Sequence, residues 1–79
     1  MSLNRAEQIV ADVQRRHPKL EPIAVYVTGG GGILRFSASG TNPTRAAVWF
    51  RDCGYPVSQV GYDVKSKVWV LYFSEKEVV

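Results

Sequence analysis

Very few residues of this chain have side chains suited to catalysis or to metal binding. The sequence contains one cysteine, Cys53, and one histidine, His17. A nucleophile and its base would have to be these two residues. Cys53, however, falls on the apolar stripe of a predicted helix, where a cysteine more often acts as an inert small hydrophobe. One cysteine and one histidine also form no zinc ligand set and no internal disulfide. We therefore expect no catalytic residue, no metal and no cofactor.

Two other chemical signatures are incomplete. The stretch TGGGGIL could cradle an anion with successive backbone N–H groups, but it lacks the Lys-Ser or Lys-Thr of a phosphate-binding loop and joins two predicted strands. The carboxylates do not form a pair suited to acid–base catalysis, because they are scattered over different elements. Those that precede the C-terminal tail are Glu7, Asp12, Glu21, Asp52 and Asp63.

The charge balance permits nucleic-acid binding without requiring it. Ten basic and seven acidic residues give a net charge of +3. A protein that follows a phosphate backbone usually concentrates its positive charge, whereas the basic residues here run along the whole chain.

The elements that position these residues begin with an amphipathic helix. Apolar residues recur at helical spacing in the first segment, and Pro18 is expected to end the helix. The basic residues of its last turn suit the negative end of the helix dipole. The apolar stripe consists of Leu3, Ala6, Ile9, Val10 and Val13.

A strand, a glycine turn and a returning strand are predicted in PIAVYVTGGGGILRFSA. A second helix follows, with Thr41 and Asn42 as candidate N-caps, Pro43 at the favoured first position and Gly54 where a left-handed C-cap belongs. The core stripe of this helix is expected to be Ala46, Trp49, Phe50 and Cys53.

The last segment predicts two more strands, near Val57 to Tyr62 and in the apolar run VWVLYF, and a charged tail after Ser74 that is expected to fray. The sequence therefore predicts one domain, 1–79. It contains an internal repeat of about 34 residues in which Pro22 corresponds to Pro56. This order predicts an α+β two-layer sandwich with a four-stranded, mostly antiparallel sheet and both helices on one face.

Strand alternation then divides the side chains between the two faces of the sheet. In VWVLYF the bulkier set, Trp69, Leu71 and Phe73, is expected under the helices. In the third strand the pattern leaves two choices open. The proline correspondence favours core positions for Val57 and Gln59, whereas burial favours Val60 and Tyr62. The uncovered face is predicted to present Tyr26, Arg35, Val68, Val70 and Tyr72.

An exposed face of this composition is typical of an interaction site. The favoured partner is a second copy of the chain or another protein, and the other possibility for the doubly apolar strand is coverage by the tail or the first helix. The alternative partner is single-stranded nucleic acid, with bases stacked on the tyrosines. The residues expected to contact nucleic acid are Arg35, Arg45, Lys65 and Lys67. No signal peptide or membrane span is evident, so a cytoplasmic location is expected.

A second route to nucleic acid comes from TRAAVWFRDCGYPV, which resembles the recognition helix and following turn of winged-helix repressors. The resemblance covers fewer than half of the residues. It implies that Thr44, Arg45 and Val48 face the major groove of DNA.

Overall fold

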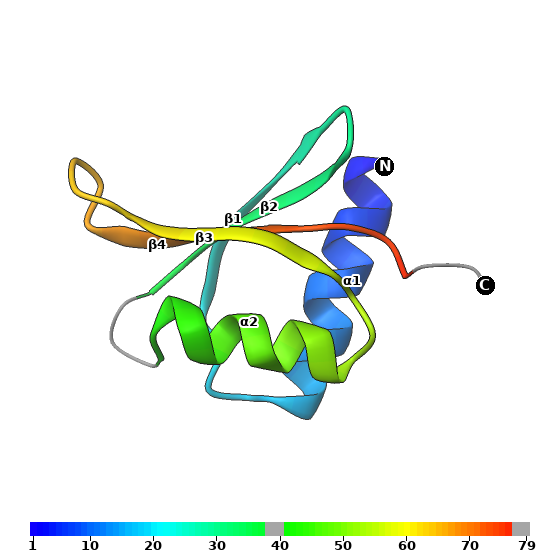
Figure 1. Ribbon diagram of the computed structural model, residues 1–79, viewed down its shortest axis with the longest axis horizontal. Coiled ribbons are helices and arrows are strands. Elements are labelled where there is room, and N and C mark those ends of the chain that lie inside the picture. The colour runs from blue at the N-terminus through cyan, green and yellow to red at the C-terminus, as the bar shows by residue number, and fades with distance from the viewer. Residues whose placement is uncertain (38–40, 77–79) are drawn as a thin grey trace.

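The computed structural model describes residues 1–37 and 41–76, which form two helices and four strands (Figure 1). In chain order these are α1 (Leu3–Arg16), β1 (Pro22–Thr28), β2 (Gly31–Phe36), α2 (Pro43–Asp52), β3 (Val57–Asp63) and β4 (Val68–Phe73). This element order is the one that the sequence predicts.

Helix α1 begins at a serine cap and ends beside a proline. The Ser2 hydroxyl accepts a hydrogen bond from the backbone N–H of Arg5 at 3.1 Å, which satisfies a donor left free at the helix start. Pro18 disfavours helical geometry at His17, which is the C-cap. Leu3 remains exposed at the first position. The rest of the predicted stripe is buried and consists of Ala6, Ile9, Val10 and Val13.

Helix α2 is bracketed as predicted. The Asn42 side chain is the N-cap and accepts a hydrogen bond from the backbone N–H of Arg45 at 2.8 Å, and Pro43 follows it. Gly54 has a φ of +91° just after the helix, a conformation that favours glycine. Trp49 is only half-buried, contrary to the predicted stripe. The buried side chains are Ala46, Ala47, Phe50 and the capping Cys53.

The four strands form one antiparallel sheet in the order β1-β2-β4-β3. The inner strands β2 and β4 meet at the centre, where Leu34 lies opposite Leu71. Leu34 pairs outward with Val25 of β1, and Leu71 pairs outward with Val60 of β3. An approximate two-fold axis through the Leu34–Leu71 pair therefore relates the two halves, which confirms the internal repeat.

Each outer strand contains one extra residue at an equivalent place. The register shifts after Pro22 in β1 and after Val57 in β3. Because of the second shift, Val57 and Val60 both lie on the helix side, and neither alternative that the sequence left open is right as a set. Val57 packs against the core, whereas Gln59 is exposed, and Val60 and Tyr62 are 37% and 45% exposed. The proline correspondence is wrong by one residue, since the structural counterpart of Pro22 is Val57 rather than Pro56.

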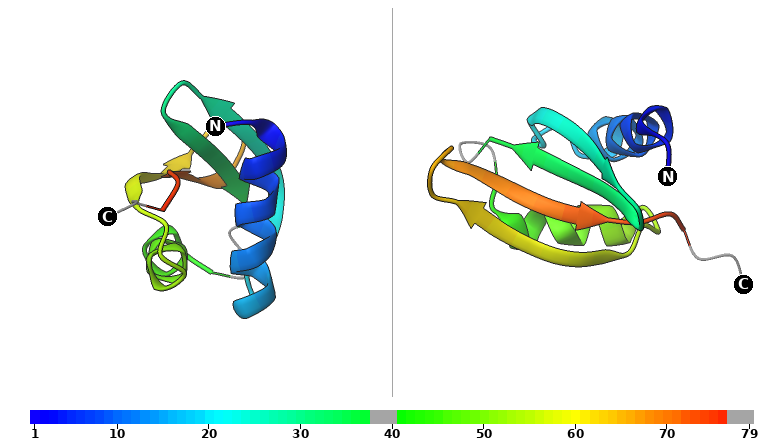
Figure 2. Two further views of the ribbon diagram at one scale, coloured as in Figure 1. Left: turned by 90° about the vertical axis from the view of Figure 1, so that its right-hand side faces the viewer. Right: turned by 90° about the horizontal axis from the view of Figure 1, so that it is seen from above.

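Both helices lie on one face of the sheet, with α1 against β1 and β2, and α2 against β3 and β4 (Figure 2). This arrangement confirms the predicted α+β fold class. Trp69 is on the helix side but only half-buried, where its ring meets Tyr62 edge-on with centroids 4.6 Å apart. The largest fully buried side chains are Phe36, Phe50, Ile9, Leu20, Leu34, Leu71 and Val13.

Only two of the four consecutive glycines form the hairpin turn. Gly29 and Gly30 form the turn, whereas Gly31 and Gly32 belong to β2. A Cβ atom at Gly32 would overlap the ring of Phe73, so that glycine provides space for the ring. Steric space for the Phe73 ring, rather than a place in the turn, therefore explains Gly32.

The start of the charged tail contacts the first helix and the loop after α2. Glu75 pairs with Arg5 at 2.6 Å, and the Lys76 ammonium lies 5.0 Å from the centroid of the Tyr55 ring. The fraying predicted for the remainder of the tail concerns residues 77–79, which lie outside the described residues.

Candidate functional site

The sheet face opposite the helices carries every residue of the predicted partner-binding set. Cross-strand partners share a face, so the pairs Tyr26–Ile33, Ile33–Tyr72 and Arg35–Val70 place these side chains together. We call this surface the open face. Its described members are Ala24, Tyr26, Thr28, Gly31, Ile33, Arg35, Gln59, Gly61, Asp63, Val68, Val70 and Tyr72.

Several members of the open face were missed at the level of sequence. Ile33 alternates with Leu34 and Arg35, so counting back from Arg35 would have identified it. Gln59 and Gly61 could not be assigned, because the extra residue in β3 changes which side chains face outward. Asp63 lies just beyond the strand expected near Val57 to Tyr62, whereas in the structure it is the last residue of β3.

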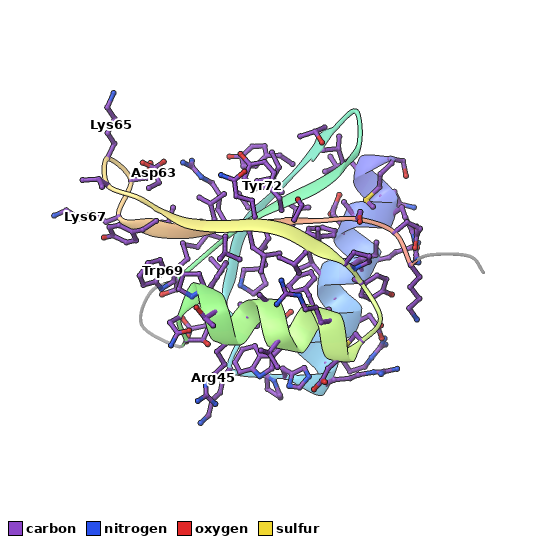
Figure 3. The ribbon with its side chains drawn as sticks, in the orientation of Figure 1. Arg45, Asp63, Lys65, Lys67, Trp69 and Tyr72 are labelled. Atoms are coloured by element: carbon purple, nitrogen blue, oxygen red, sulfur yellow. The ribbon has the colours of Figure 1, made fainter. Side chains whose placement is uncertain are left out.

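The open face is apolar and aromatic along its centre. Tyr26 is 48% exposed on β1, and the Tyr72 side chain stands on the side away from the helices (Figure 3). Ile33, Val70 and Tyr72 are half-buried, although no helix covers this side. The inner strands therefore offer an apolar strip that only their own neighbours shield.

The charged pair of the open face is satisfied within the chain. The Arg35 guanidinium donates to the Asp63 carboxylate and to the Ser66 hydroxyl, the latter at 3.4 Å. Asp63 also accepts hydrogen bonds from the backbone N–H groups of Lys65 at 3.0 Å and Ser66 at 3.4 Å. The Ser66 backbone N–H is the main cause that lowers the pKa of Asp63, with Arg35 contributing. The Arg35 guanidinium is therefore already paired within the chain in the absence of a ligand.

The surface is hollowed on two sides of Tyr72. One hollow, of about 270 Å³, lies towards the glycine turn, where Gly30, Gly31 and Gly32 are among its lining residues. The other, of about 190 Å³, lies over Gly61 and is also bordered by Val70 and Tyr72. In both hollows glycines leave room beside an aromatic ring. The open face is therefore not flat, and side chains of a partner could fit into these hollows.

The alternative nucleic-acid set is divided between separate places. Lys65 and Lys67 project from the loop between β3 and β4 (Figure 3). Arg45 lies on α2, on the other side of the sheet. The structure therefore brings Arg35, Lys65 and Lys67 to one end of the sheet and leaves Arg45 apart.

The helix that resembles a winged-helix recognition helix does expose the implied residues. Thr44, Arg45 and Val48 line a shallow hollow of about 470 Å³ on α2, together with Asn42 and Trp49. A strand pair, β1 and β2, precedes this helix, where winged-helix repressors have two helices.

Cys53 and His17 each lie in a packed setting. Cys53 is buried, and burial raises the pKa of its thiol, which favours the protonated and unreactive form. The His17 ring stacks on Trp49, with centroids 5.1 Å apart and planes inclined by 6°. Each side chain has a packing role that explains its presence.

Among residues 1–37 and 41–76, no group of three or more histidine, cysteine or carboxylate side chains is placed to hold a metal ion. Over the same part of the chain no helix is long and apolar enough to cross a membrane. Comparison of the sequence with protein-family models and with curated proteins, and of the fold with solved structures, found no significant match.

Proposed function

We propose that the protein is a small non-catalytic binding module that self-associates, or binds a protein partner, through the open face of its sheet. The observation that carries this proposal is an apolar, tyrosine-bearing face left uncovered by the helices, whose charged pair, Arg35 and Asp63, is satisfied internally. Contiguous apolar surface of this kind usually marks an interaction site. A charge-neutral apolar surface suits another protein surface better than a phosphate backbone.

The area of the open face determines how strong the self-association is expected to be. Four strands spaced about 4.8 Å apart and about six residues rising about 3.3 Å each cover roughly 19 by 20 Å. Two such faces bury on the order of 800 Å² in total, which is at the small end of protein interfaces. We therefore expect a reversible dimer at micromolar concentration rather than a permanent one.

The test is the mass of the protein in solution across a concentration series, with Val70→Lys as the disrupting variant. A lysine at Val70 places an unpaired charge in the contact, so the dimer should dissociate while the monomer stays folded. Val64→Lys is the matched control, because Val64 is 76% exposed on the loop between β3 and β4. A monomeric mass for the unmodified protein at every concentration, with no protein partner captured, would contradict the proposal.

Single-stranded nucleic acid is the rival partner, stacking on Tyr26 and Tyr72. It receives less support, because Arg35 is already paired with Asp63 and Arg45 lies on the other side of the sheet. The rival predicts oligonucleotide binding that weakens steeply with added salt and on Arg35→Ala. Such binding, together with a monomeric protein, would favour nucleic acid over self-association.

A further inference from the structure

Gly61 has no explanation within a single copy of the chain. It lies inside β3, where glycine weakens a strand because it contributes no side chain and costs entropy. Its backbone is not in the positive-φ region, which among the described glycines holds only Gly54. A Cβ atom added at Gly61 would meet no atom of residues 1–37 and 41–76 within 4 Å. Neither backbone geometry nor internal packing therefore requires glycine here.

The place of Gly61 on the surface supplies a reason. It pairs with Val70 on the open face and forms the floor of the hollow of about 190 Å³. A glycine inside a strand often marks a site where another chain approaches closely. The missing side chain leaves space that a bulky group from outside can fill.

A group of suitable size stands at the equivalent position in the other half of the molecule. Under the approximate two-fold axis Val60 corresponds to Val25, so Gly61 corresponds to Tyr26. Tyr26 is 48% exposed on the same face, and its outer strand is at the opposite edge of the sheet. One face therefore carries both a projection and a hollow, at related positions on opposite edges.

A second copy is the partner that matches this arrangement. When two identical sheets pack face to face about a two-fold axis inclined by roughly 25° to the strands, the edge strand β1 of one copy lies over the edge strand β3 of the other, and Tyr26 comes opposite Gly61. The same contact then occurs twice, once on each side of the axis. The Arg35–Asp63 pair leaves no net charge on the face to oppose the approach of an identical surface.

We infer that Gly61 receives the Tyr26 ring of a second copy of the chain, so that each dimer contains two such contacts. This inference rests on the self-association proposed above and names the residues that fix its geometry. Tyr26 is the anchoring ring, and Gly61 is the position whose size decides whether the two faces can close.

The first experiment fills the hollow. Gly61→Val adds a side chain in open space and raises strand propensity, so the monomer should melt no lower than the unmodified protein. Its dimer dissociation constant should rise by at least about 10-fold, because the ring can no longer enter. Gly29→Val is the matched control, since Gly29 also has nothing within 4 Å but lies in the hairpin turn, away from the hollow.

The second experiment exchanges the two groups and does not depend on one variant folding well. Tyr26→Gly alone should weaken the dimer by at least about 10-fold through loss of the anchor, and Gly61→Tyr alone should block it. The variant that carries both changes should recover most of the affinity, because the ring and the hollow have traded places. Sedimentation velocity measures all four proteins over the same concentrations.

The outcomes separate this inference from the proposed function. A dimeric unmodified protein whose association is unchanged by Gly61→Val overturns the Gly61 contact and leaves self-association standing. Dissociation by Gly61→Val without recovery in the exchanged variant overturns the assignment to Tyr26. An unmodified protein that is monomeric throughout overturns both the inference and the self-association on which it rests.

Discussion

The two halves of this molecule, α1-β1-β2 and α2-β3-β4, agree at the centre of the helix side of the sheet and differ at two positions of the open face. At three pairs of equivalent positions on the helix side they hold the same kind of side chain. These pairs are Val25 and Val60, Leu34 and Leu71, and Phe36 and Phe73. On the open face Tyr26 corresponds to Gly61, and Arg35 corresponds to Tyr72.

This contrast distinguishes what the fold requires from what it leaves free. Leu34 and Leu71, like Phe36 and Phe73, are buried between the sheet and the helices, where close packing restricts the side-chain volume, so the halves resemble each other there. Among residues 1–37 and 41–76 no helix or strand covers the open face, so packing against a second layer does not restrict its side chains. The proposed binding function assigns the differences at these positions to the choice of partner.

The largest expected effect concerns the shared core. Leu34→Ala and Leu71→Ala each remove a fully buried side chain at the centre of the sheet, so each should lower the free energy of unfolding by about 2–5 kcal/mol. The two losses should be similar, because the positions are equivalent. Urea denaturation of the monomer measures both, with Leu3→Ala, at an exposed position, as the control expected within about 0.5 kcal/mol.

A large loss for only one of the two leucines would contradict the equivalence of the halves. It would mean that the stability of the core depends mainly on one half, rather than equally on both. The comparison of open-face positions would then lose its basis, since it relies on the same axis.

A smaller effect is expected where the halves differ on the helix side itself. The counterpart of Trp69 is Gly32, and the Trp69 ring is half-buried against Tyr62 rather than fully enclosed. Trp69→Ala should therefore cost about 2–3 kcal/mol, below the roughly 3–5 kcal/mol of a fully buried tryptophan. Tyr72→Ala should cost the monomer less than this and yet raise the dimer dissociation constant by about 10-fold or more.

Measuring both variants by denaturation and by sedimentation tests the assignment of the two faces of β4. If Tyr72→Ala unfolds the domain while Trp69→Ala leaves it folded and monomeric, the strand is reversed and the interaction surface contains Trp69, Leu71 and Phe73. An effect of Tyr72→Ala on stability alone would make the tyrosine a structural residue.

The sequence predicted this fold because most of its signals are local. Apolar spacing defined both helices, Pro18 and Gly54 defined where they end, and alternation in β4 separated Trp69 from Tyr72. The extra residue in β3 was beyond local reasoning, since a register shift depends on pairing with a strand that lies elsewhere in the chain.

The same limit applies to the candidate site. Tyr26 and Tyr72 could be placed on the open face by counting along each strand, whereas the hollow at Gly61 could not. The pairing of Arg35 with Asp63 joins residues 28 positions apart and became visible only once β2, β4 and β3 were in order. The exposed residues can therefore be assembled into a site only when the register between strands that are distant in the sequence is known.

The smallest expected effect lies in the two hairpin loops, which also distinguish the halves. The first hairpin closes through Gly29 and Gly30, whereas the second closes through a longer loop whose backbone donates to Asp63. Hydrogen bonds from Ser66 and Lys65, together with Arg35, hold the pKa of Asp63 in the folded protein below its ordinary value of 3.8. Only the second hairpin should therefore carry a carboxylate-dependent stability.

The direction of the pH dependence follows from that lowered pKa. A carboxylate whose pKa is lower in the folded state stabilises the protein above the unfolded-state pKa, and this stability is lost as the pH falls through the folded-state value. Asp63→Asn should melt slightly below the unmodified protein at about pH 6, and this difference in melting temperature should close as the pH falls through the lowered pKa of Asp63. The difference in melting temperature is small because the asparagine oxygen can still accept the loop N–H bonds.

Melting curves across this pH range measure the difference between the two proteins. An equal difference at every pH would show that Asp63 acts through shape rather than charge. Asp12 and Glu75, which also have lowered pKa values, are present in both proteins, so the difference isolates the second hairpin.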